Sequence, residues 1–225
     1  MSVTIHPILL GFDHCYIVQG QKAIMIDGGS PKQVKGFRSA LERLSLKPED
    51  IQLIVLTHGH WDHIGTAKEI KDITGAKLAL HRHEKDWLEK SLTPLPPGVT
   101  TWGRLFVKIM ALFMPWVHIP ATSVDIVLGD EEFSLTEYGI PGKIMYTPGH
   151  SKGSVSVLLE TGEAFVGDLA MSEFPLRLSP GLPILAEDLQ TVRASWKLLL
   201  AAGAEMVYPA HGKPFSADIL RKALL

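Results

Sequence analysis

The sequence predicts an α+β fold in which two packed β-sheets are covered by helices. Short apolar strands are grouped in both halves of the chain, with helical segments between them. Each half also contains an apolar strand that ends close to a histidine, His58 in the first half and His211 in the second. No glycine-rich phosphate loop opens a helix, so a dinucleotide-binding fold has no support.

The composition bounds the class of protein. The chain has 225 residues, of which 46% are hydrophobic, and this is enough to bury one large core. We therefore expect a single domain over residues 1–225. The formal net charge of −2 supplies no positive field for nucleic acid, which is not an expected partner.

Cysteine content and apolar runs bear on the compartment. Cys15 is the only cysteine, so a disulfide framework is excluded and a reducing compartment is expected. Residues 1–11 lack the basic segment and apolar core of a secretory signal. The longest apolar run, 109–117, is far shorter than the ~20 residues of a membrane span. We expect a cytoplasmic protein without stable membrane insertion.

The first half is expected to alternate strands with helices. Ser30 as cap, Pro31 at the first helical position and Gln33 after them predict a helix start. Apolar residues then recur at helical spacing as far as Leu44. The expected elements are strands at 3–12, 15–18, 22–26, 51–56 and 77–80 and helices at 31–44, 64–74 and 84–90.

Residues 91–123 are expected to form an apolar insertion. After a proline-rich break, the apolar positions from Trp102 to Trp116 fit one face of a helix. No acidic residue lies between Glu89 and Asp125, whereas three basic residues do. One interpretation is a basic, apolar lid that favours an acyl chain. A homodimer interface through 102–116, a cover for the sheet edge, and a membrane-surface face are the alternatives.

The second half returns to short strands. A helix with one apolar face is predicted at 187–202, and Ser216 is expected to cap a terminal helix. The expected strands are 125–128, 132–135, 143–146, 154–159, 164–166 and 206–208.

The segment from Thr57 to Gly65 is the strongest functional signal, because it places three histidines and an aspartate directly after an apolar strand. Histidine nitrogen and carboxylate oxygen bind zinc, iron or manganese. Alternate side chains of an extended segment share a face, so His58 and His60 can hold one ion, while Asp62 and His63 reach a second. Three glycine- or proline-flanked loops beside apolar strands offer further ligands: His150, Asp168 and His211.

Taken together, these residues resemble the metallo-β-lactamase superfamily. Its His-x-His-x-Asp-His motif corresponds to His58, His60, Asp62 and His63, and its later ligands correspond to His150, Asp168 and His211. The resemblance covers nearly the whole chain and implies a four-layer αβ/βα sandwich with the site between the sheet edges. It also implies that His58, His60 and His150 hold one metal, that Asp62, His63 and His211 hold the other, and that Asp168 bridges them.

The remaining histidines and two further residues have ordinary interpretations. His81 follows a strand and is a candidate to line the cleft. Asp27 is interpreted as a turn residue or a support for a ligand, and Cys15 as a small buried apolar residue. Four histidines are expected to be surface or loop residues without metal: His6, His14, His83 and His118.

The expected cofactors are two divalent ions, with zinc as the main expectation and iron or manganese as alternatives. A site with two such ions is expected to catalyse hydrolysis. Two ions bring four positive charges, and Asp62, Asp168 and a metal-bridging hydroxide leave about +1, which favours an anionic transition state. Asp62 is a candidate proton shuttle. We therefore expect a dinuclear hydrolase acting on a small ester, thioester or lactone that carries an acyl or apolar group. The alternatives are a phosphodiesterase on a nucleotide or phospholipid-type substrate, and a non-hydrolytic metal protein.

Departures from the superfamily's subgroups narrow the choice. Asp168 differs from class B β-lactamases, and Gly212 to Leu225 is short for the helical glutathione-binding region of glyoxalase II. Met171 stands where many lactonases have tyrosine, which weakens that assignment. His60 argues against flavo-diiron oxidoreductases, and a complete second site argues against persulfide dioxygenases. The natural substrate is not specified by the sequence.

Overall fold

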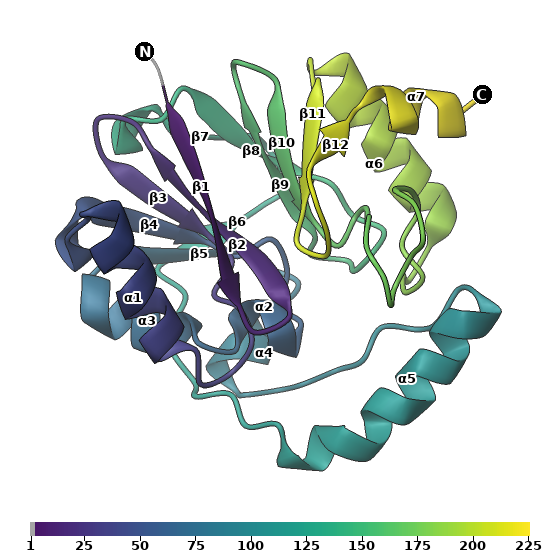
Figure 1. Cartoon of the computed structure of the whole chain (residues 1–225), viewed down its shortest axis with the longest axis horizontal. Coiled ribbons are helices and arrows are strands. Elements are labelled where there is room, and N and C mark those ends of the chain that lie inside the picture. The colour runs from purple at the N-terminus through teal and green to yellow at the C-terminus, as the bar shows by residue number, and fades with distance from the viewer. Residues whose placement is uncertain (1–2) are drawn as a thin grey trace.

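The structure, a computed structural model, describes residues 3–225 and contains two six-stranded sheets (Figure 1). The strand order is β1-β2-β3-β4-β5-β6 in the first sheet and β12-β11-β10-β9-β8-β7 in the second. The first sheet comprises β1 (Thr4–Leu10), β2 (Asp13–Gln19), β3 (Ala23–Ile26), β4 (Ile51–Val55), β5 (Lys77–His81) and β6 (Ile126–Leu128). The second comprises β7 (Phe133–Ser134), β8 (Gly142–Tyr146), β9 (Val155–Leu159), β10 (Glu163–Gly167), β11 (Met206–Pro209) and β12 (Phe215–Ser216).

Helices lie on the outer faces of both sheets (Figure 1). The α-helices are α1 (Val34–Leu44), α2 (Trp61–Ile64), α3 (Ala67–Thr74), α4 (Lys85–Glu89), α5 (Thr101–Phe113), α6 (Leu189–Ala201) and α7 (Asp218–Ala223). Three short 3₁₀ turns are η1 (Pro48–Asp50), η2 (Met114–Trp116) and η3 (Thr136–Tyr138). Among the residues described, no helix combines the length and apolar character needed to cross a membrane.

The two faces of each sheet belong to different cores. Along β3, Met25 packs with Phe37 of α1, whereas Ile24 and Ile26 pack between the sheets, because neighbouring strand side chains point to opposite faces. In the second sheet, Phe165 of β10 joins the core between the sheets, while its neighbours pack against α6 around Trp196. Both sheets are therefore buried on two faces, and the predicted four-layer αβ/βα sandwich is confirmed.

Strand directions bring several loops to one edge. Strands β3 to β6 are parallel, so the carboxyl ends of β3, β4 and β5 lie at the same edge of the first sheet. Strand β2 runs antiparallel to β3, so its first residues reach that same edge. In the second sheet β10 and β11 are parallel, and the residues after Gly167 and Pro209 emerge together. This is the edge at which the sequence predicts the metal ligands.

Three helix boundaries differ from the sequence predictions. The first helix begins at Val34 rather than Pro31, because the Ser30 hydroxyl donates to Asp13 and does not cap the helix. The helix expected over 64–74 begins at Ala67, and α2 is a separate short helix that ends at Ile64. The last helix is capped by Ala217, although the Ser216 hydroxyl still accepts the backbone N–H of Asp218.

The insertion forms a helix, as its spacing predicts. Helix α5 lies apart from the two sheets, connected by extended segments on either side (Figure 1). The segment before it pairs with the second half of the chain: Val99 donates to Ile184 O, and Ala186 donates to Pro97 O, each at 3.0 Å. The Trp102 indole also donates to Pro175 O at 2.8 Å. Helix α5 is thus fastened at its first turn.

Candidate metal centre

Three histidines form the first cluster. His58 and His60 follow β4, and His150 follows β8; all three are at least 96% buried. The donor atoms of this group lie within 4.8 Å of one another, and His60 Nδ1 is 2.9 Å from His150 Nε2. The His150 ring is oriented from behind, because its Nδ1 lies 2.8 Å from Leu185 O. Two ring nitrogens at this distance form a hydrogen bond when one of them carries a proton, and can instead share a cation when neither does.

Asp27, which follows β3, orients the next histidine. One carboxylate oxygen accepts the Thr57 backbone N–H at 2.8 Å, and the other lies 3.0 Å from His63 Nδ1. This contact leaves His63 Nε2 facing the cluster, where it lies 3.3 Å from Asp168 Oδ1. A histidine held on its far nitrogen by a carboxylate is the usual arrangement behind a metal ligand. The interpretation of Asp27 as a support is consistent with this geometry.

Asp168 lies between the two groups of histidines. Its Oδ1 is 3.3 Å from Nε2 of both His63 and His211, and its Oδ2 is 3.6 Å from His150 Nε2. Asp62 Oδ2 lies 3.6 Å from His211 Nε2. All seven residues selected from the sequence thus belong to overlapping groups of donors that could hold a metal ion.

Asp13 is an additional carboxylate that sequence reasoning missed. It is fully buried and groups with Asp62, His63 and His211, and its Oδ1 is 3.4 Å from His211 Nε2. The signal was an acidic residue at the first position of a strand. Asp13 reaches the cluster because β2 runs antiparallel to β3, and no local sequence motif predicts this strand pairing.

Unsatisfied polar atoms test whether metal ions fit these residues. In the described chain, four buried atoms that face the cluster have no hydrogen-bond partner: Asp13 Oδ1, His58 Nε2, His63 Nε2 and Asp168 Oδ1. A buried unpaired polar group costs about 1–3 kcal/mol, and a bound cation would satisfy these four atoms together. Nitrogen and carboxylate donors are those of zinc, iron and manganese sites. The residues present therefore fit divalent metal ions.

The pKa values of the two groups of histidines are shifted in opposite directions. Burial, reinforced by neighbouring histidines, lowers the pKa of His58 well below its usual range and that of His60 to about 3. Burial also lowers the pKa of His150. Burial alone would do the same at His63 and His211, but the nearby carboxylates outweigh it and raise the pKa of both well above the usual range. The first group is therefore neutral and the second protonated when no metal is bound.

The carboxylates respond to those protonated rings. Burial would raise the pKa of Asp168, but His211 and His63 hold it well below its usual range. The pKa of Asp62 is likewise lowered, since its contact with His211 outweighs burial. Burial, followed by repulsion from Asp62, raises the pKa of Asp13. Two ionised carboxylates, Asp62 and Asp168, thus lie beside the protonated rings of His63 and His211.

Glu84 links two ligand loops. Its buried carboxylate accepts the backbone N–H of Gly59 through one oxygen and that of Gly153 through the other, the latter at 2.7 Å. A Cβ on Gly59 would lie 2.8 Å from the Trp87 ring, and one on Gly153 would lie 2.7 Å from the Glu84 carboxyl carbon. Glycine is required at both positions for this close approach. Glu84 had no sequence motif to identify it.

The other histidines lie outside the metal-binding groups of residues 3–225. The expectation that His81 lines the cleft is wrong, because its ring stacks on Tyr146 and its Nε2 lies 3.3 Å from Asp130. His14, expected to be an ordinary loop residue, lines the cavity beside the cluster. His6, His83 and His118 do not line that cavity.

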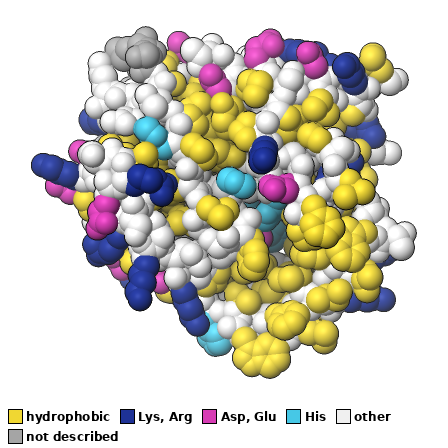
Figure 2. All heavy atoms as spheres, in the orientation of Figure 1, with side chains coloured by type: hydrophobic (Ala, Val, Ile, Leu, Met, Phe, Trp, Pro, Cys, Tyr) yellow, Lys and Arg dark blue, Asp and Glu magenta, His cyan; other side chains and the backbone are white. Residues whose placement is uncertain are grey.

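A cavity of about 640 Å³ opens onto the cluster. Figure 2 shows histidine and acidic side chains at the centre of this face, bordered by apolar ones. His60, Asp62, Asp168 and His211 form its polar end. Apolar walls come from β1 and the turn after it, from α5 and the segment before it, and from the segment after β10: Leu9, Phe12, Leu95, Pro96, Phe106, Val107, Met110, Met171, Phe174, Pro175, Leu176 and Leu185.

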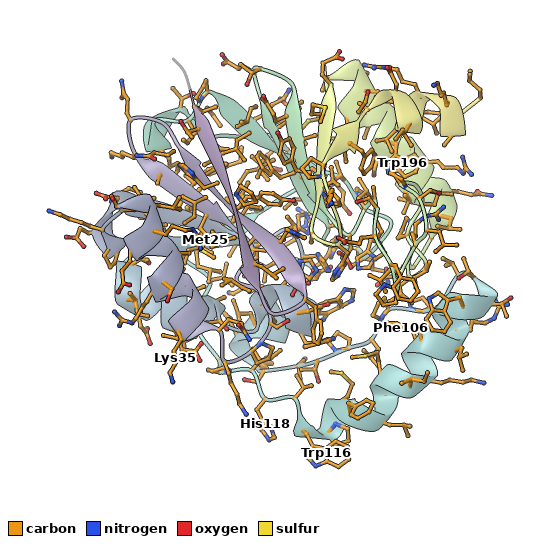
Figure 3. The ribbon with its side chains drawn as sticks, in the orientation of Figure 1. Met25, Lys35, Phe106, Trp116, His118 and Trp196 are labelled. Carbon is orange, nitrogen blue, oxygen red and sulfur yellow. The ribbon has the colours of Figure 1, made fainter. Side chains whose placement is uncertain are left out.

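The insertion contributes apolar side chains to the cavity but not its basic ones. Phe106 points from α5 toward the body of the molecule, whereas Trp116 lies at the far end of the insertion (Figure 3). Arg104 and Lys108 are exposed and do not line the cavity. The lysine that does line the cavity is Lys213, two residues after His211. Lys213 was not singled out from the sequence. The expectation of a basic lid is therefore wrong in its charge, since the lid's contribution is apolar.

Comparison with known proteins agrees with this geometry. The family model described as the metallo-beta-lactamase superfamily matches residues 10–211. The metallo-beta-lactamase fold-containing protein ST1585 of Sulfurisphaera tokodaii is 30% identical over 213 residues, covering 93% of this chain and 76% of the relative. The crystal structure of ST1585, superposed over the whole chain and 86% of that protein, has a TM-score of 0.69 at 26% identity.

Two further similar proteins are described by their hydrolase activity or by their bound metal. The probable metallo-hydrolase YflN of Bacillus subtilis is 23% identical over 240 residues, covering 98% of this chain and 88% of the relative. The protein TTHA1623, solved in a di-iron-bound form, has a TM-score of 0.67 at 22% identity, covering 96% and 97% of the two chains. At 22% identity, the similarity to TTHA1623 shows a shared fold.

Proposed function

The chain belongs to the metallo-beta-lactamase superfamily of metal-dependent hydrolases, and on this premise we propose that it is a two-metal hydrolase of esters, thioesters or lactones with an apolar acyl group. The observation that carries the proposal is a cluster of metal-binding side chains at the end of a cavity with apolar walls. Such a cavity suits an apolar substrate whose reacting group must reach the cluster.

Seven residues would hold the ions. His58, His60 and His150 would bind the first, and their neutral, buried rings suit zinc. Asp62, His63 and His211 would bind the second. Asp168 would bridge the two, because its oxygens face histidines of both groups.

Two divalent ions in this cluster would supply a water of lowered pKa at neutral pH and positive charge beside a developing oxyanion. The chain's own residues then orient the substrate. The apolar walls exclude water around the acyl group, which strengthens electrostatic interactions near the cluster. Asp27 and Leu185 O hold the rings of His63 and His150 in place.

Asp62 is the group we assign to proton transfer. It lines the cavity, and its side chain is 17% exposed, whereas the Asp168 side chain is 6% exposed. Its pKa is lowered from the usual value, so it is ionised at neutral pH and can accept a proton. Its Oδ2 lies 3.6 Å from His211 Nε2, which orients the carboxylate at the edge of the cluster.

The cavity wall favours a carbonyl substrate over a phosphodiester. Among the described residues that line it, Lys213 is the single lysine or arginine, against a wall of apolar side chains. Phosphate recognition usually relies on several such cations or on a helix N-terminus. A phosphodiesterase therefore remains the second candidate, and it lacks a supporting contact at the cavity.

A turnover panel on protein of measured metal content tests the proposal. We would assay acyl thioesters, esters and lactones of increasing chain length, with bis(p-nitrophenyl) phosphate as the phosphodiester. The expected result is hydrolysis of carbonyl substrates with kcat/KM rising with chain length, and no turnover by chelator-treated protein. Turnover confined to the phosphodiester, or equal turnover without metal, would contradict the proposal.

A further inference from the structure

Three carboxylates from distant parts of the chain converge on one nitrogen. His211 Nε2 lies 3.4 Å from Asp13 Oδ1, 3.3 Å from Asp168 Oδ1 and 3.6 Å from Asp62 Oδ2. A single N–H points in one direction and can serve one of these oxygens well. Charged hydrogen bonds are also shorter, at about 2.7–2.9 Å. Hydrogen bonding therefore does not account for the arrangement.

A shared cation does account for it. Donors bound about 2.0–2.2 Å from one ion lie roughly 3.0–3.6 Å apart when they are neighbours in its coordination shell. The three distances around His211 Nε2 fall within that interval. Asp13, Asp62, His63 and His211 each offer a donor atom within 4.8 Å of the others.

The Asp13 carboxylate is held with one oxygen free. Its Oδ2 accepts the Ser30 hydroxyl at 3.0 Å, while its fully buried Oδ1 has no partner among the described residues. The turn before it is fixed against Ser30: Gly11 has φ +85°, and a Cβ there would lie 2.4 Å from the Ser30 side chain. The free oxygen is thus directed at the cluster by a tight local packing arrangement.

We propose that Asp13 is a further protein ligand of the ion bound by Asp62, His63 and His211, and that it makes this position select iron(II) or manganese(II) more strongly than the three-histidine position does. The inference rests on the proposed two-metal function. With Asp168, the position would have three carboxylate oxygens and two imidazole nitrogens. Carboxylate oxygen suits manganese, and five donors exceed the four of a tetrahedral zinc site.

The test measures metal binding rather than turnover. Wild type and the Asp13→Asn variant would be stripped, loaded with Mn²⁺ or Zn²⁺, dialysed and analysed for metal stoichiometry by mass spectrometry. Free Mn²⁺ would be titrated by electron paramagnetic resonance. We expect two ions in wild type, and at least a 10-fold weaker second Mn²⁺ in the variant, with a smaller change for Zn²⁺; outer-shell substitutions alone weaken metal binding by about 10–100-fold.

Ser30→Ala provides a second variant if Asp13→Asn does not fold. It removes the hydroxyl that holds Asp13 Oδ2 and leaves the carboxylate in place. We expect a smaller loss of the second Mn²⁺. Asp72→Asn, at an exposed carboxylate on α3, is the matched control and should bind metal as wild type does.

Two results would overturn the inference, and they can be told apart. If wild type binds two ions and Asp13→Asn binds both with unchanged affinities and the same Mn²⁺ to Zn²⁺ ratio, Asp13 is not a ligand. If wild type itself binds fewer than two ions, the two-metal proposal fails, and the role of Asp13 fails with it.

Discussion

Asp168 is the side chain through which the two groups of histidines meet. Its oxygens face His63 and His211 on one side and His150 on the other. We predict that Asp168→Ala lowers metal content at both positions and reduces kcat by roughly 100-fold or more, since ligand loss exceeds the effect of outer-shell changes. Metal analysis and steady-state kinetics on the same preparation measure this.

The exposed carboxylate of Asp188 supplies the comparison for that variant. Asp188→Ala lies outside the cluster and should keep both metal content and kcat. An Asp168→Ala protein with two bound ions and wild-type turnover would rule out the bridging assignment.

Glu84 acts on the metal cluster through backbone hydrogen bonds. In Glu84→Gln, the side-chain amide has one acceptor oxygen, so one of the N–H groups of Gly59 and Gly153 loses its partner, at about 1–3 kcal/mol. Burial raises the pKa of Glu84, which means that burying the charge is unfavourable and that removing it offsets part of this loss. We predict a modest fall in Tm but clearly weaker metal binding at the three histidines.

Calorimetry and zinc competition would separate these two effects. Glu187→Gln, a nearby exposed position, should change neither quantity. Unchanged zinc affinity in Glu84→Gln would show that the link between the two loops does not support the ligands.

Helix α5 has two apolar faces with different surroundings. Phe106, Val107 and Met110 line the cavity, whereas Leu112 and Phe113 are 67% and 56% exposed. We predict that Phe106→Ala lowers kcat/KM by roughly 10-fold for a long-chain acyl substrate and little for an acetyl substrate, because the loss of a buried aromatic ring is worth about 1.5–3 kcal/mol.

Leu112→Ser is the matched variant on the outer face of the helix, and it should leave both constants unchanged. If it instead alters the size of the protein in solution, as measured by light scattering, the outer face is an interface between two copies. Equal loss for long and short substrates in Phe106→Ala would contradict the acyl-binding role of the helix.

Point variants are preferable to deletion of the insertion. Val99 pairs with Ile184, and Pro97 pairs with Ala186. Leu185, which lies between Ile184 and Ala186, holds the His150 ring through its carbonyl oxygen. Removing 97–119 would release this segment. A deletion would therefore disturb a metal ligand together with the substrate cavity, and its effects on the two could not be separated.

For the molecule as a whole, stability should depend on pH differently with and without metal. His63 and His211 have a raised pKa in the folded protein, so their stabilising contribution is complete below about pH 6.5 and is lost as the pH rises through the folded values. His58, His60 and His150 have a lowered pKa and destabilise the fold below pH 6.5. We predict that metal-free protein is most stable near pH 6.5.

Calorimetry from pH 5 to 9 on stripped and loaded protein checks this prediction. Bound metal replaces the protons of the second group, so the gain in Tm on adding metal should grow as the pH rises above 6.5. A metal-free Tm that increases through that interval would contradict the expected protonation of His63 and His211.

The layers of the fold, and the seven residues that the structure brings together in one cluster, could be predicted from the sequence, because both follow from local patterns. Continuous apolar runs such as 53–55 identify strands buried on both faces, and His58 to His63 form a compact motif. Ser30 was misassigned as a helix cap, since its hydroxyl is used by Asp13, a residue 17 positions away. Asp13 and Glu84 act through pairings that exist only after the sheets have formed.

The different depths of the two groups of ligands have a kinetic consequence. The first position meets the cavity through His60 alone, because His58 and His150 are at least 99% buried and do not line it, whereas the second position meets it through Asp62 and His211. We therefore expect an ion at the second position to leave through the cavity faster than one at the first, whose release also needs movement of the loops that carry His58 and His150. Mixing loaded protein with a chelator should therefore release metal in two phases of equal amplitude, and the slow phase should accelerate in Glu84→Gln. The protein would then exchange one ion with its surroundings while retaining the other.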